Sequence, residues 1–283
     1  KSNNEKFNFS NVNLFERQVE FDNARLQKGE ITLTDLAQSE SSLAAANANL
    51  IKAKTELLTS ITNFERVTRD KAPNFENLDG RASVELPNTL KDSLNLASVN
   101  NVSLLISQLD YEISKKELNI EKARLSPTAS IKVSKSENKD FSSSIDKTDD
   151  ETVKATISWP IIKGGENISS IKKSSLEKQR FQLLLKDKKN KTTSETSNSW
   201  SNYQSSKSVL EATKAQLKAA EIANEGITLE YDSGNTRTTL EVIQSRSLLL
   251  ESRIAFAQAK RDFMVSKFEL ALQLGTLSQK TVK

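Results

Sequence analysis

Apolar side chains recur three and four residues apart over most of the chain, which is the spacing of one buried face of an α-helix. This pattern predicts helix across residues 12–70, with an interruption at Gly29, and again across residues 102–125. It returns over residues 166–230 and 238–274. We therefore expect a mainly helical protein that is built from long helices packed side by side.

Few residues interrupt this helical pattern, because the chain has 7 Gly and 4 Pro among its 283 residues. Pro73, Gly80 and Pro87 mark residues 71–87 as a linker, after which a short helix is expected. Pro127 ends the predicted helix at residues 102–125, because proline cannot continue the hydrogen-bond ladder.

Two stretches near the middle of the chain follow a period of two instead, which predicts a pair of strands. The two stretches read "PTASIKVSKSE" and "ETVKATISWP", and residues 138–150 between them read as a polar loop. Each stretch has about ten residues, near the length of a tilted strand that crosses a membrane. A half-buried soluble hairpin has the same alternation, and the pattern alone favours that more common case.

The stretch from residue 166 to residue 230 is the longest in the helical pattern, and Gly226 is the one glycine in it. As one helix it would span roughly 98 Å. A compact domain of this size does not hold such a helix, so the segment predicts a coiled-coil or tubular assembly. Its outward face is rich in Ser, Lys, Thr and Asn, which argues against contact with lipid.

Composition excludes several kinds of chemistry. The chain has no Cys and no His, so thiolate chemistry is absent and the commonest general base and metal ligand is missing. We expect no enzyme activity, no metal site and no cofactor. A net charge of +4 from 41 basic and 37 acidic residues describes a mixed, solvated surface, so no nucleic-acid partner is expected.

An internal repeat is the strongest signal in the sequence. "QSESSL" at residues 38–43 matches "QSRSLL" at residues 244–249, an offset of 206, and Gly29 matches Gly234 at an offset of 205. The second copy is preceded by a long helix and the strand pair, whereas the first copy has about two dozen residues ahead of its glycine. The repeat thus predicts that this chain continues a longer protein whose first half supplies a further helix and strand pair.

The ordered set of motifs resembles the TolC-like outer-membrane efflux channels. The segments that carry the resemblance are "ISWPIIKGGE" before a very long helix, "LEYDSGNTRTTLEVIQSRSLLLESRIAFAQAKRDF" and the ending "LALQLGTL". It runs from about Asn11 to Leu277. It implies a homotrimer in the outer membrane of a Gram-negative bacterium, reaching into the periplasm, with antiparallel coiled-coil helices in a periplasmic α-barrel and the hairpin strands in a shared transmembrane β-barrel.

The resemblance also implies a division of the chain. The expected segments are residues 1–71 (α-barrel helices of the first repeat), 72–101 (linker and short helix), 102–126 (an α-barrel helix), 127–163 (membrane hairpin), 164–275 (long α-barrel helices of the second repeat) and 276–283 (C-terminal tail). In the hairpin, Val153, Ala155 and Ile157 would meet the outer-membrane lipid, the alternate polar side chains would line water, and Trp159 would lie at the membrane interface.

A channel gate is implied at the interhelical turns around Gly29 and Gly234. The family's pattern pairs a Tyr and an Arg near the second turn with an Asp and the preceding Thr near the first, and these fall here on Tyr231, Arg237, Asp35 and Thr34. Glu241 matches an acidic constriction, whose second acidic position is Gln244 here. Arg is suited to such a lock because its guanidinium pairs with carboxylates through charge-assisted hydrogen bonds.

The implied function is a passive exit duct, working with a periplasmic adaptor protein and an inner-membrane transporter in a tripartite efflux pump or a type I secretion system. An alternative is a periplasmic coiled-coil adaptor without a pore. Adaptors usually add a Gly- and Pro-rich β-domain, which the sequence lacks, and ten-residue amphipathic strands that end in Trp also favour the channel.

Overall fold

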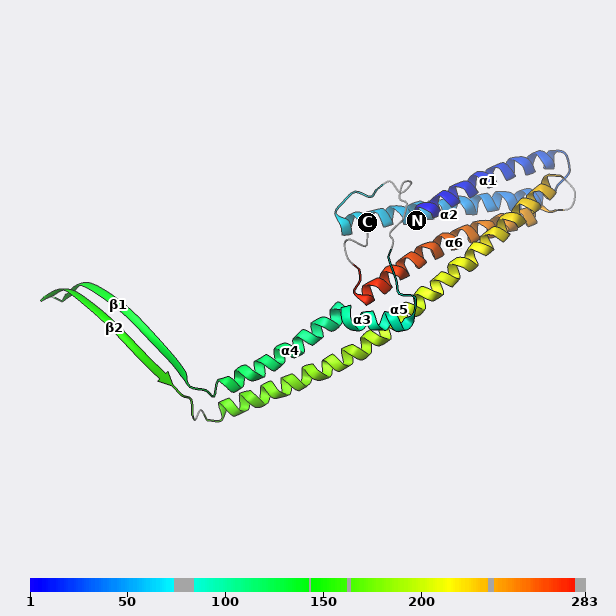
Figure 1. Ribbon diagram of the computed structural model, residues 1–283. Coiled ribbons are helices and arrows are strands. Elements are labelled where there is room, and N and C mark those ends of the chain that lie inside the picture. Colours follow the sequence, from blue (N-terminus) through cyan, green and yellow to red (C-terminus); the bar gives the residue numbers. More distant parts are fainter. Residues whose placement is uncertain (74–83, 143, 162–163, 234–236, 278–283) are drawn as a thin grey trace. The chain divides into compact units, whose positions relative to one another are not determined.

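The computed structural model describes residues 1–73, 84–142, 144–161, 164–233 and 237–277. Six helices and one hairpin follow each other in these ranges (Figure 1). Their bounds are α1 (Ser2–Gln27), α2 (Leu33–Thr68), α3 (Leu90–Asn100), α4 (Val102–Ala123), β1 (Thr128–Ser142), β2 (Ile145–Ser158), α5 (Glu166–Asp232) and α6 (Thr239–Leu274). The long helices lie where the apolar spacing predicts them, and α5 alone has 67 residues.

The chain divides into two compact units. One comprises residues 1–93 and 196–283, and the other comprises residues 94–195. Helix α5 contributes its first part to the second unit and its last part to the first.

The first unit is a bundle in which α1 packs along α2 and both contact α6. Its core contains Val12 and Phe15 of α1 with Ala46 and Leu50 of α2, and Ile243 of α6 packs against them. Burying side chains of this size stabilises a fold by about 1.5–3 kcal/mol each. The last part of α5 lies along α6, where the ring of Tyr203 stacks on that of Phe263 with their centroids 5.8 Å apart.

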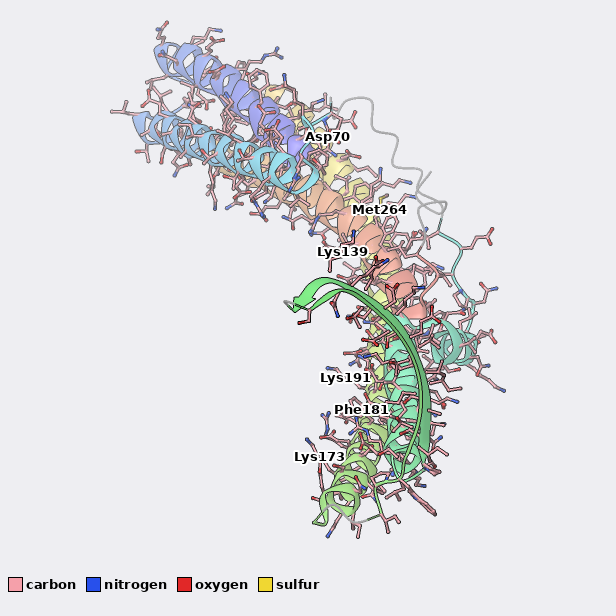
Figure 2. The ribbon with its side chains drawn as sticks, turned by 90° about the vertical axis from the view of Figure 1, so that its left-hand side faces the viewer. Asp70, Lys139, Lys173, Phe181, Lys191 and Met264 are labelled. Carbon is pink, nitrogen blue, oxygen red and sulfur yellow. The ribbon has the colours of Figure 1, made fainter. Side chains whose placement is uncertain are left out.

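The second unit holds α4, the hairpin and the first part of α5. Helix α4 runs beside this part of α5 in both views, and Figure 2 shows Lys173, Phe181 and Lys191 along it. The N-terminal end of α4 is capped by Asn101, whose side-chain oxygen accepts from the backbone N–H of Leu104 at 3.0 Å.

The hairpin pairs β1 and β2 antiparallel, and its register separates two faces. One face carries Ala129 opposite Ile157, Ile131 opposite Ala155, and Val133 opposite Val153. The other carries Ser130 opposite Thr156, Lys132 opposite Lys154, and Ser134 opposite Thr152. The predicted division into an apolar and a polar face is therefore present in the structure.

The expected polar loop at residues 138–150 is wrong, because the two strands continue through most of it. They have 15 and 14 residues, and Asn138 still faces Thr148 across the ladder (Figure 2). Cross-strand ion pairs extend the pairing, with Lys135 Nζ 2.8 Å from a Glu151 carboxylate oxygen and Lys147 Nζ 2.7 Å from one of Glu137. Polar composition predicted a loop here, but opposite charges on facing strands also stabilise a ladder.

Among the described residues, no helix combines the length and the apolar character needed to cross a membrane.

Candidate functional site at the interhelical turns

The turn between α1 and α2 is built around Gly29, whose φ is 76°. The backbone N–H of Gly29 donates to the carbonyl of Leu26 at 2.9 Å, and that of Glu30 donates to Arg25 at 3.0 Å. This pair of bonds satisfies the last carbonyls of α1, and glycine adopts the left-handed conformation that it needs without steric cost. The corresponding position Gly234 lies outside the described residues.

Both helices that leave the two turns begin with the same cap. Thr32 and Asp35 form a capping box at the start of α2, and Thr238 and Glu241 form one at the start of α6. The backbone N–H of Thr32 donates to the Asp35 carboxylate at 2.9 Å, and that of Thr238 to the Glu241 carboxylate at 2.8 Å. The residues of the two boxes are 206 positions apart, the offset of the sequence repeat.

These caps fix the charge state of both carboxylates. The backbone N–H of Thr32, and then its hydroxyl, lower the pKa of Asp35 below its usual value. The backbone N–H of Thr238, and then the guanidinium of Arg237, lower the pKa of Glu241. Both side chains are therefore held as anions that serve first to order the helix starts.

Close to the turns, a polar cluster is buried where α1, α2, α6 and the last part of α5 meet. The Tyr231 hydroxyl donates to the Asp22 carboxylate at 2.6 Å, and it lies 3.0 Å from the Thr239 hydroxyl. The same carboxylate accepts from the Gln18 amide at 2.9 Å and from the Ser39 hydroxyl. Asp22 is 0% exposed and Tyr231 2%, so this contact excludes water. We call these five residues the Asp22 cluster.

The electrostatics of the Asp22 cluster keep Tyr231 a neutral donor. Burial raises the pKa of its hydroxyl, and the hydrogen bond to Asp22 raises it further. The guanidinium of Arg25 lies over the Tyr231 ring, 4.9 Å from the centroid. Burial lowers the pKa of Arg246, whose guanidinium donates to the Leu14 carbonyl at 3.2 Å. The hydrogen bonds of Asp22 to Ser39 and Tyr231, and of Tyr231 to Thr239, thus join α1, α2, α5 and α6.

Arg237 lies between two carboxylates of its own hairpin. Its Nε is 2.6 Å from a Glu230 oxygen, and its Nη1 is 2.9 Å from a Glu241 oxygen. All three side chains are partly exposed, and exposed pairs contribute about 0–1 kcal/mol each. Arg237 therefore ties the end of α5 to the start of α6 with contacts that can exchange readily.

Within the described part of the chain, the structure does not bring Tyr231 or Arg237 onto Asp35, the partner expected for both. Tyr231 bonds to Asp22 instead, and Arg237 to Glu230 and Glu241. The Asp35 carboxylate accepts the cap bonds of Thr32. Thr34 is exposed on the first turn of α2, and Gln244 is exposed one turn beyond Glu241 on α6.

Trp159 lies just after β2. Its indole N–H donates to the carbonyl of Leu125 at 3.1 Å, and 62% of the residue is exposed. This bond ties the two ends of the hairpin together and leaves most of the ring on the surface.

Sequence reasoning missed the Asp22 cluster, although two signals for it and the caps were present. "TLTD" at residues 32–35 and "TTLE" at residues 238–241 both fit the capping-box pattern. Gln18 and Asp22 continue the buried stripe of Val12 and Phe15 at helical spacing, so two polar residues occupy core positions of α1. A polar residue at such a position needs a buried partner.

Comparison with known proteins identifies the relatives of this chain. The family model described as outer membrane efflux protein matches residues 93–276. The chain is 24% identical over 270 residues to the outer membrane efflux protein BepC of Brucella suis, covering 95% of this chain and 58% of BepC. It is 22% identical over 277 residues to the outer membrane protein TolC of Escherichia coli, covering 93% of this chain and 56% of TolC.

A solved membrane protein from Pseudomonas aeruginosa has the same fold. It superposes with a TM-score of 0.80 at 13% identity, covering 96% of this chain and 63% of that one. The chain thus spans a little over half the length of the curated relatives that it matches.

Proposed function

Because this chain belongs to the outer membrane efflux protein family, we propose that it is part of a passive exit duct in the outer membrane, gated at its periplasmic tip. Members of this family are outer-membrane channel proteins of Gram-negative bacteria, and they transport and do not catalyse. Channels of the family are trimers. The family match also sets aside the alternative of an adaptor without a pore.

The two-faced hairpin supports the proposed membrane barrel. Its apolar face is open to the surroundings, with Ile131 77% and Ile157 79% exposed. An exposed apolar face next to a polar one is the arrangement of strands between lipid and a watery lumen. We place the apolar face toward lipid and the polar face toward the lumen, with Trp159 at the membrane interface.

An uncovered stripe on α4 supports assembly into a trimer. Val102, Ile106, Leu109, Ile113 and Ile120 are each more than half exposed and follow the spacing of a coiled-coil seam. Exposed apolar stripes of this kind mark contacts with another chain. The proposed occupant is a helix of a neighbouring copy, which completes the wall of the α-barrel.

The Asp22 cluster carries the proposed gate. Figure 1 shows the end of α5 and the start of α6 at the same end of the first unit as the α1–α2 turn. Through Tyr231 and Asp22, the α5–α6 hairpin is fastened to the α1–α2 hairpin, and opening the tip requires this contact to break. Thr34, Asp35 and Arg237 lie at the turns, where a neighbouring copy or an adaptor can reach them.

Glu241 and Gln244 form the proposed constriction on the first turns of α6. Gln244 is uncharged, and the Glu241 carboxylate already accepts from Arg237 and from the cap. The ring that three copies would form therefore attracts cations less strongly than a ring of unpaired carboxylates.

A periplasmic adaptor and an inner-membrane transporter are the proposed partners, in an efflux pump or a type I secretion system. The transporter and the adaptor select the cargo in such an assembly.

Conductance in a planar bilayer tests the duct. The full-length protein, purified in detergent and reconstituted, should give discrete current steps and cross-link as a trimer. A protein that stays monodisperse without detergent and gives no current steps would contradict the proposal.

A further inference from the structure

On the polar face of the hairpin, two lysines lie directly opposite each other. Lys132 of β1 pairs with Lys154 of β2 in the ladder, and both are exposed. Like charges that face each other across a ladder destabilise it. A second lysine rung, Lys139 opposite Lys147, lies on the other face of the hairpin. There Lys147 has the carboxylates of Glu137 and Asp149 as partners, and Lys135 has that of Glu151.

Acidic side chains do not neutralise the Lys132–Lys154 pair in the described residues of its face. The adjoining rungs are Ser130 with Thr156 and Ser134 with Thr152. The nearest carboxylate on this face is Asp150, opposite Ser136. Asp150 and Lys154 are four positions apart along β2, about 14 Å between their Cα atoms, and Thr152 lies between them on this face.

The position of the pair along the hairpin is also defined. Its rung lies between Ile131–Ala155 and Val133–Val153, whose side chains form the apolar face. On that apolar face the next rung is the ion pair of Lys135 and Glu151. If the proposed barrel is correct, the two lysines therefore point into the lumen at the depth of the hydrocarbon layer.

We propose that Lys132 and Lys154 form an anion-binding ring inside the barrel, which takes carboxylate or phosphate groups of passing cargo. This inference rests on the proposed function. Three copies would place six ammonium groups at one level of the lumen, and rings of Lys or Arg are the chemistry of anion and phosphate pores. The neighbouring Ser130, Ser134 and Thr156 hydroxyls can donate to the same anion.

The experiment measures block of the current by inorganic phosphate, added on the barrel side of the reconstituted full-length channel. Phosphate should reduce the wild-type current at concentrations that leave a Lys132→Gln/Lys154→Gln channel conducting fully. The Cl⁻/K⁺ permeability ratio of that variant, from reversal potentials in a KCl gradient, should fall by roughly fivefold, the size expected of one unit charge at contact distance in water.

Lys135→Gln/Lys147→Gln is the matched control, since it removes the same charge from the other face of the hairpin. It should keep both the phosphate block and the permeability ratio. If the Lys132→Gln/Lys154→Gln channel conducts and is blocked like wild type, the ring is overturned while the duct stands. A wild-type protein that forms no channel contradicts the duct, and the ring with it.

Discussion

The Tyr231 hydroxyl at the end of α5 donates to the Asp22 carboxylate of α1 across 2.6 Å, and both residues are buried. The two lie 209 positions apart in the chain. A charged group without water depends on its hydrogen-bond donors, because an unsatisfied buried carboxylate is costly. The contact therefore links the two helical hairpins, and removing either partner lowers the free energy of unfolding.

Tyr231→Phe removes one donor from Asp22 and should lower the free energy of unfolding by about 1–3 kcal/mol. Urea denaturation measures this. Tyr203→Phe is the control, because the Tyr203 ring stacks on Phe263 and its hydroxyl is outside the cluster. It should change the free energy of unfolding by no more than about 0.5 kcal/mol. Equal effects of the two substitutions would count against a special role of the Asp22 contact.

The two capping boxes give a second prediction. Thr32→Ala and Thr238→Ala should each destabilise the protein by about 1 kcal/mol, because each removes the side chain that accepts the N3 backbone N–H. Thr34→Ala changes an exposed Thr in the first turn of α2 that is not part of the capping box and should have little effect. Thermal unfolding of the three variants checks this, and a Thr34→Ala loss as large as that of Thr32→Ala would contradict it.

A third prediction concerns pH. Asp35 and Glu241 have lowered pKa values in the folded protein, so their stabilisation is present above the unfolded-state pKa and is lost as pH falls through the folded-state pKa. Amide hydrogen exchange at the starts of α2 and α6 should therefore quicken, relative to the intrinsic rate, below about pH 4. The start of α4 is the control, since Asn101 caps it and does not titrate. Parallel changes at all three starts would argue against the carboxylate caps.

A fourth prediction concerns the α4 stripe. Ile106→Gln with Ile113→Gln places polar groups on the surface proposed to meet a neighbouring copy. The trimer should dissociate at lower detergent or denaturant concentration, because each buried Ile contributes about 1.5–3 kcal/mol. Glu112→Gln with Asn119→Gln changes exposed side chains off the stripe and should leave the trimer intact. Analytical ultracentrifugation distinguishes the cases, and an unchanged Ile106/Ile113 variant would refute this seam.

Much of the fold follows from local patterns in the sequence. Apolar spacing of three and four predicts the long helices, and the turn at Gly29 follows from one glycine between two such runs. The two faces of the hairpin follow from strict alternation. The strands are longer than predicted because ion pairs such as Lys147–Glu137 act between residues that local composition treats separately.

The candidate site was harder to predict because its partners lie far apart in the chain. Tyr231 stood out in the sequence beside the second turn, but Asp22 did not, since one carboxylate in a helix is ordinarily solvated. Its role depends on burial by α2, α5 and α6, which only the packed bundle supplies. Within this chain Tyr231 bonds to Asp22, while the Asp35 carboxylate accepts the cap bonds of Thr32.

The most direct test of the gated duct is the single-channel conductance of Tyr231→Phe in the full-length protein, beside wild type and Tyr203→Phe. If the Tyr231–Asp22 contact holds the tip closed, Tyr231→Phe should conduct more than wild type in the same bilayer, while Tyr203→Phe conducts as wild type does. A Tyr231→Phe conductance equal to that of wild type and Tyr203→Phe would contradict the gate.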